Sequence, residues 1–255
     1  MISRKELKMA AKEALRGKWA FSVALVLIIF LLPSVLNIIP FLGAIAVLVL
    51  TPAISYVPQE IFLKVKRNDD VKIGNALSAL FSKLGSYWGI VIRTFLKLLP
   101  WFLLMLVGSF LTVSATTSRF MYNDLSSSMI SPTTATLTIS SIYSLLGSIL
   151  FIVGYALTFT NSLFYLLAIY VKTDNPSMTC KEAVLKSREL MTGHRIEYFI
   201  LSLSFIGWAL VGAFTFGIGL FYVIPYMYTT FAAFYDELAG IKNYTEENNN
   251  EVIQF

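Results

Sequence analysis

Apolar residues along this chain form long uncharged runs, and short stretches rich in Lys and Arg separate them. The runs cover residues 20–59, 98–118, 125–171 and 198–235. A helix needs about 20 consecutive apolar residues to cross the hydrocarbon core of a bilayer. The pattern therefore predicts an all-α, polytopic helical membrane protein with about six transmembrane helices.

Proline, glycine and serine-rich positions divide these runs into individual spans. Pro33 and Pro40 bracket one expected turn, and Gly212, Gly217 and Gly219 interrupt the last run. Ser and Thr supply 10 of the 17 residues from 125 to 141, which we interpret as a polar outer loop. Because proline breaks or kinks helices, the 20–63 and 196–238 hairpins remain open to a re-entrant path. We expect spans at about 20–38, 41–63, 88–113, 142–170, 196–213 and 217–238.

The charged residues indicate how these spans are oriented. Eighteen of the 20 Lys and Arg residues lie within 4–18, 64–97 and 172–195. Basic residues near span ends accumulate on the cytoplasmic side, so we expect both termini to be cytoplasmic and the protein to reside in a bacterial cell membrane. The net charge of +5 then indicates attraction to anionic lipid headgroups rather than to nucleic acid.

Each basic stretch also contains an amphipathic pattern with helical spacing, at about 4–16, 71–84 and 178–191. Ser3 with Glu6, and Thr179 with Glu182, have the spacing of a capping box. A glycine follows each pattern, and a glycine just past a helix end accepts a left-handed backbone. We expect three helices on the cytoplasmic surface and a threefold internal repeat of surface helix plus two spans. The alternative is that basic, amphipathic connectors are a general need of such proteins.

Residues for catalysis are scarce. His194 is the only histidine and Cys180 the only cysteine, so neither a metal site with several such ligands nor a disulfide is supported. The sequence contains no Gly-rich phosphate loop and no His-Glu-x-x-His motif. We therefore expect no enzyme, no cofactor and no metal.

The candidate binding residues lie at span ends and inside two spans. Long basic and aromatic side chains at span ends reach headgroups, although a partner protein is an alternative contact. An amide or a proline inside a span can line a cavity, although helix packing is the simpler interpretation. The candidate headgroup or partner contacts are Lys18, Trp19, Arg93, Lys97, His194 and Arg195, and the candidate interior positions are Asn161 and Pro225.

Several short motifs resemble one known family. They are Met191-Thr192-Gly193-His194-Arg195, Leu203-Ser204-Phe205-Ile206-Gly207-Trp208 and Thr215-Phe216-Gly217-Ile218-Gly219, with Gly17-Lys18-Trp19 near the start. They are similar to the bacterial multi-pass membrane proteins catalogued as domain of unknown function 975. Because that family has no established activity, the resemblance implies fold and location only.

We expect residues 1–239 to form a single integral membrane domain and residues 240–255 an acidic, polar cytoplasmic tail. Two functions remain open. One is a non-catalytic module that binds lipid, a membrane protein partner or a second copy, as an accessory factor for the envelope or for export. The other is a repeat-built transporter or permease for an uncharged or lipid-like substrate. A water-accessible path through the bilayer would favour the second.

Overall fold

A computed structural model describes residues 3–39, 41–126 and 134–241. Every regular element within those ranges is a helix, so the all-α class is confirmed. The chain divides into two compact units. We call residues 1–93 with 164–255 the body, and residues 94–163 the hairpin.

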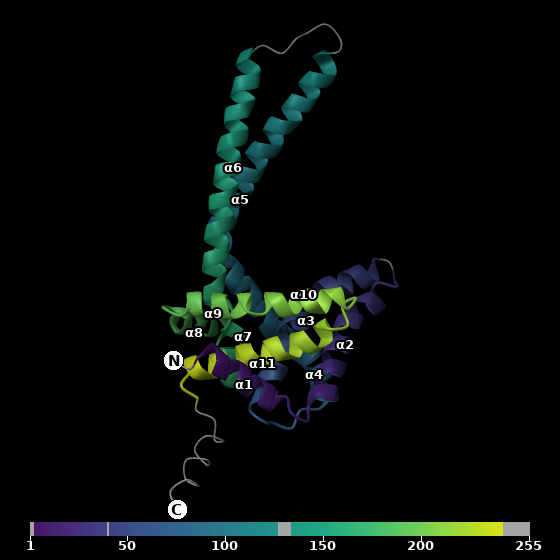
Figure 1. Cartoon of the computed structure of the whole chain (residues 1–255). Coiled ribbons are helices and arrows are strands. Elements are labelled where there is room, and N and C mark those ends of the chain that lie inside the picture. Colours follow the sequence, from purple (N-terminus) through teal and green to yellow (C-terminus); the bar gives the residue numbers. More distant parts are fainter. Residues whose placement is uncertain (1–2, 40, 127–133, 242–255) are drawn as a thin grey trace, which may run out of the picture. The chain divides into compact units, whose positions relative to one another are not determined.

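The body contains most of the helices (Figure 1). They are α1 (Arg4–Ala14), α2 (Trp19–Leu36), α3 (Leu42–Lys66), α4 (Ile73–Ser82), the start of α5 (Leu84–Ser126), α7 (Ala168–Asp174), α8 (Cys180–Met191), α9 (Arg195–Leu203), α10 (Ile206–Phe214) and α11 (Leu220–Leu238). The hairpin contains the rest of α5 and α6 (Thr134–Ser162), and a 3₁₀ turn (Leu163–Tyr165) follows α6.

Five segments of the described chain are long and apolar enough to cross a membrane, which confirms a polytopic membrane protein. They are Trp19–Leu36, Leu42–Lys66, Leu84–Met121, Thr138–Asp174 and Arg195–Phe214. The sequence predicts about six. The difference lies in 217–238, where α11 forms but is not among the five, and its last turns carry the buried Asp236.

The predicted helix starts are confirmed, and one of the predicted helix ends is wrong. Ser3 and Thr179 both close capping boxes, with Glu6 and Glu182 respectively. Gly17 and Gly193 adopt φ of +79° and +89°, as expected for glycines that end a helix. Gly85 does not, because α4 ends at Ser82 and Gly85 already lies in the first turn of α5.

The predicted polar outer loop at 125–141 is also wrong over much of its length. Helix α5 continues to Ser126, and α6 begins at Thr134 instead of residue 142. Helix propensity is a weak prior that contacts between helices override. Arg119 on α5 donates to the hydroxyls of Ser140 and Ser141 on α6, which gives the polar start of α6 such a contact. Residues 127–133 lie outside the described part.

Small residues hold the two helices of the hairpin together. An added Cβ at Gly108 would meet the Phe151 nitrogen at 2.4 Å, and one at Gly154 would meet the Met105 nitrogen at 2.6 Å. Close backbone approach at small residues is a common way for helices to associate in lipid. Gly108 and Gly154 therefore lie in the contact between α5 and α6.

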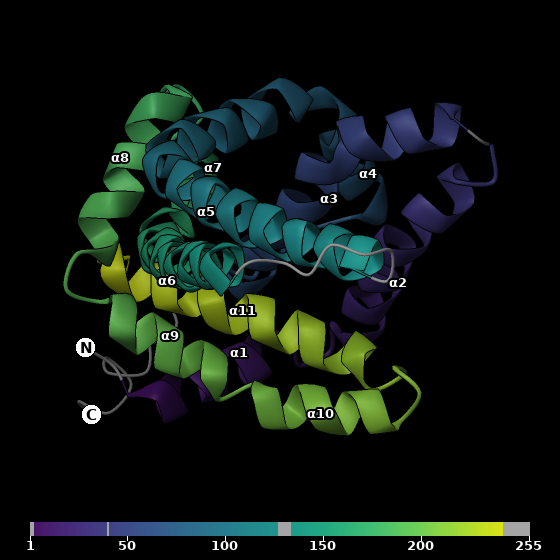
Figure 2. The same cartoon turned by 90° about the horizontal axis from the view of Figure 1, so that it is seen from above.

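Helix α11 is the centre of the body and contacts α1, α2, α3 and α10. Its aromatic rings stack on neighbours: Tyr235 lies 5.3 Å from Tyr170, and Phe231 lies 4.8 Å from Tyr198, between ring centroids. Figure 2 shows α9 and α10 running alongside α11. The predicted acidic tail lies outside the described residues from 242 onward.

Candidate functional site

The body contains a crevice of about 590 Å³ between α2, α3 and α11. Apolar side chains form most of its wall, and the hydroxyls of Ser34, Ser55 and Tyr228 add a few polar groups. The lining residues are Val26, Ile29, Phe30, Pro33, Ser34, Ile54, Ser55, Pro58, Ile224, Met227 and Tyr228. None of them carries a charge at neutral pH.

Prolines in two of the helices help to shape this crevice. Pro33 lies inside α2 and Pro58 inside α3, and a helical proline cannot donate to the carbonyl four residues earlier. The Ser55 hydroxyl does not serve as a free donor, because it bonds to the Thr51 carbonyl at 2.9 Å. The crevice therefore suits an apolar ligand better than one that needs several hydrogen bonds.

A buried ion cluster lies where α3, α7 and α11 meet. Asp236 is only 1% exposed, and it accepts from Lys66 at 2.6 Å and from Arg67 at 2.6 Å. Arg67 also pairs with Asp174 at 2.6 Å, and the Tyr235 hydroxyl donates to Asp174 at 2.8 Å. Burial opposes the charge of Arg67, but its bonds to the two aspartates outweigh burial and raise its pKa. Every charge here has an opposite partner, so the cluster ties the helices together.

A second cluster surrounds Glu60 near the end of α3. The carboxylate is 2% exposed and accepts from Lys64 at 2.9 Å, from Lys83 and from the Tyr87 hydroxyl at 3.0 Å. Glu60 and Lys64 have the i, i+4 spacing at which two side chains meet on one face of a helix. Lys83 follows α4 and Tyr87 lies on α5, so this cluster connects α3 to both of these helices.

Basic side chains from α1 surround a pocket of about 440 Å³ beside Ser204 and Tyr226. The Lys8 ammonium donates to the Ser204 carbonyl at 3.3 Å and lies 4.5 Å from the centre of the Phe205 ring. Lys12 lies 5.8 Å from the Tyr226 ring centre. Burial, together with the positive charges of Arg4 and Lys12, lowers the pKa of Lys8.

Most of the predicted headgroup contacts also have protein partners. Lys18 donates to the Asn68 side chain at 3.3 Å, and the Trp19 ring lies 6.1 Å from that of Tyr222. His194 contacts Glu197 at 3.0 Å, and Arg195 lies 4.1 Å from the centre of the Phe164 ring. Arg93 and Lys97 are exposed on α5. None of these contacts joins one of the six candidate residues to another.

The two predicted interior positions belong to different units and each has its own hydrogen bonds. The Asn161 amide donates to the Leu157 carbonyl of its own helix at 2.8 Å. Pro225 is buried within α11, and its carbonyl accepts from Thr229 at 2.8 Å. Its neighbours Ile224 and Met227 line the crevice, so the region around Pro225 belongs to the candidate site.

Sequence reasoning missed the Asp236 cluster and the crevice. Asp236 comes directly after the last uncharged run, and an acid at that position was a usable signal. Its pairing with Lys66 and Arg67 depends on contacts across 170 and 169 positions of sequence. Within the described residues no group of three or more His, Cys, Asp or Glu side chains could hold a metal ion.

Comparison with known proteins gives one match, which covers nearly the whole chain. No curated protein and no solved structure matches. A family model described as "Protein of unknown function (DUF975)" matches residues 1–242, and the resemblance carried by the sequence motifs is thereby confirmed. The chain belongs to the DUF975 family of proteins of unknown function.

Proposed function

We propose that this protein is a non-catalytic lipid-binding protein of the bacterial cytoplasmic membrane, with both termini on the cytoplasmic side. In this proposal the crevice between α2, α3 and α11 takes the acyl chain of a membrane lipid, and the protein acts as an accessory factor of the envelope or of export. The observation that carries the proposal is the uncharged, largely apolar wall of that crevice.

The position of the crevice supports a lipid ligand. Two of its three walls are helices long and apolar enough to cross a membrane, α2 and α3. Large apolar side chains near it, such as Phe30 and Leu31, are 64% and 51% exposed, and in a bilayer such surfaces face acyl chains. A lipid tail therefore reaches the crevice without crossing a polar barrier.

A permease for an uncharged or lipid-like substrate is the second candidate, and the proline positions favour it. Substrate sites of transporters often lie where helices are broken near the middle of the membrane. Pro33 and Pro58 both line the crevice. Movement of a labelled phospholipid across the bilayer of proteoliposomes distinguishes the two, because binding alone leaves the rate equal to that of protein-free vesicles.

The test of lipid binding uses a phospholipid whose acyl chain carries a photoactivatable diazirine. Illumination of the reconstituted full-length protein is expected to label peptides with Ile29, Ser55 and Met227, and unlabelled lipid is expected to compete with this labelling. The exposed face of α6 around Leu145 is the internal control, since its 64% exposure predicts labelling without saturation. Labelling of the crevice peptides that is no stronger and no more saturable than that of the control face would contradict the proposal.

A further inference from the structure

We infer that residues 195–238 form a re-entrant loop that enters a single leaflet and returns to the side it came from. We call these residues the re-entrant loop. Its apolar edge, formed by α10 and the turn at 214–218, contacts the acyl chains of that leaflet. By length and composition alone, Arg195–Phe214 qualifies as a span. The contacts of α11 and α1 point to a different path, and this inference does not depend on the crevice.

The first observation is that residues near both ends of α11 contact residues at one end of the α2–α3 pair, although Phe221 also reaches Phe30 further along α2. Lys18, before α2, bonds to Asn68, just after α3, so these two positions mark one end of the pair. At the start of α11, Tyr222 lies 6.1 Å from Trp19 between ring centroids. At its other end, Asp236 binds Arg67 at 2.6 Å. A helix that crossed the bilayer beside α2 and α3 would have its two ends at opposite ends of that pair.

The contact of the re-entrant loop with α2 indicates how deeply the loop enters the bilayer. Phe221 lies 6.2 Å from Phe30 between ring centroids, and Phe30 is eleven positions along α2 from Trp19, or about 16 Å at helical rise. The hydrocarbon core is about 30 Å thick. The start of α11 thus reaches about the middle of the bilayer.

The second observation is the position of the basic helix α1 beside the re-entrant loop. Lys8 contacts Ser204, at the break between α9 and α10, and Lys12 lies over Tyr226. Tyr226 is ten residues, or about 15 Å, from Asp236 along α11. If residues 195–238 crossed the bilayer, these ammonium groups would lie near the midplane of the bilayer, where charged side chains are strongly disfavoured. In a re-entrant loop they lie closer to the headgroups, and a positive helix suits an anionic leaflet.

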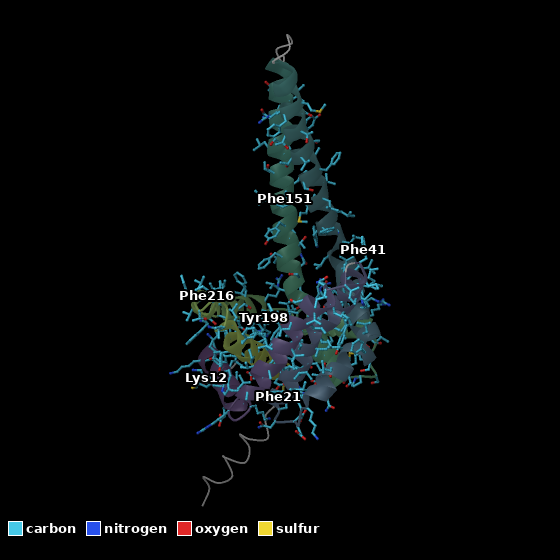
Figure 3. The ribbon with its side chains drawn as sticks, turned by 90° about the vertical axis from the view of Figure 1, so that its right-hand side faces the viewer. Lys12, Phe21, Phe41, Phe151, Tyr198 and Phe216 are labelled. Carbon is cyan, nitrogen blue, oxygen red and sulfur yellow. The ribbon has the colours of Figure 1, made fainter. Side chains whose placement is uncertain are left out.

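The third observation is the apolar edge itself. Phe214 and Phe216 are 86% and 100% exposed, and Ile218 is 66% exposed. Trp208 and Val211 on α10 are 52% and 58% exposed. Figure 3 shows Phe216 at the outer edge of the body. A contiguous apolar surface of this kind marks an interaction site, and the adjacent basic helix favours a lipid leaflet as its occupant.

The experiment measures from which side of the membrane the tip of the re-entrant loop can be labelled. Single cysteines replace Phe216 or Ile218 in the full-length protein, in a Cys180→Ser background, and a membrane-impermeant maleimide is applied to right-side-out and to inverted vesicles. Ile38→Cys, 75% exposed in the turn after α2, reports the far side. Asp70→Cys, exposed after α3, reports the near side.

We expect F216C and I218C to react at least tenfold more slowly than I38C from the far side. Reaction from the Asp70 side, or protection from both sides, supports the re-entrant path. Reaction of either variant from the far side at a rate similar to that of I38C would overturn it, whatever lipid the crevice binds. The two tip positions guard against a defect caused by one substitution.

Discussion

The body and the hairpin are held together by different interactions. In the body, large side chains such as Phe62, Tyr87 and Phe234 are fully buried, and charged clusters join its helices. In the described hairpin the buried positions are all small: Gly108, Ala115, Ser140, Gly147 and Gly154. The body thus has an internal core like that of a soluble domain, whereas the hairpin relies on close backbone approach.

This difference indicates which region is suited to bind a ligand. A core built from large side chains and bent helices leaves spaces between its elements, as at the crevice. Two helices in close contact at glycines leave little room between them at those positions. The body and hairpin should therefore respond differently to the same kind of substitution.

The largest expected effect is that of Asp236→Ala in the body. It leaves the buried Lys66 ammonium and the Arg67 guanidinium without this partner, and breaking a buried pair typically destabilises by about 3–5 kcal/mol. Thermal unfolding of the purified protein in detergent measures the loss. Glu189→Ala, at the exposed pair with Lys186, is the control and should cost less than about 1 kcal/mol. Equal losses would show that the Asp236 cluster does not hold the body together.

The next largest effect is expected in the hairpin from Gly108→Ala. The new Cβ meets the Phe151 nitrogen at 2.4 Å, so α5 and α6 must separate locally, at about 1–3 kcal/mol for overpacking. Spin labels at the exposed Val113 and Leu145 should report a longer distance in the variant. Gly207→Ala on α10 is the matched control, because nothing lies within 4 Å of its added Cβ. An unchanged label distance would remove the glycine contact as the basis of hairpin packing.

Glu60→Gln should have a smaller effect than Asp236→Ala. Lys64 and Lys83 are 37% and 45% exposed, so both can turn to solvent when the carboxylate charge is removed. The Gln side chain still accepts one bond, and we expect a loss of about 1–2 kcal/mol in thermal unfolding. A loss as large as that of Asp236→Ala would mean that exposure of the cationic partner does not moderate the effect.

The smallest effect is expected at the start of α8. Thr179→Ala removes a helix cap and should lower the free energy of unfolding by about 1 kcal/mol.

Backbone and side-chain bonds to Thr179 lower the pKa of Glu182. The stabilisation from that carboxylate is therefore present above its ordinary pKa of 4.5 and is lost as the pH falls through the lower folded value. The difference in unfolding temperature between Glu182→Gln and the parent protein should shrink on acidification from neutral pH to about pH 3. A difference that does not depend on pH would contradict this account of the cap.

The sequence predicts the helices well where local chemistry decides them. The capping boxes at Ser3 and Thr179 and the end glycines at Gly17 and Gly193 depend on neighbouring residues only. Prediction failed at Gly85, which lies in the first turn of α5, and at 134–141, which belongs to α6. Glycine, serine and threonine only weakly disfavour a helix, and contacts such as those of Arg119 with Ser140 and Ser141 override that preference. The crevice and the Asp236 cluster depend on contacts between distant segments, which no local pattern contains.

The most direct test of the account is the number of lipids that remain bound to the protein after gentle extraction, counted by native mass spectrometry. Ser55→Trp fills the crevice, and Leu145→Trp adds the same ring to an exposed face of the hairpin. The account predicts that the parent protein and Leu145→Trp retain a stoichiometric lipid and that Ser55→Trp loses it. Equal retention by all three proteins, or retention by none of them, would contradict a lipid-binding crevice.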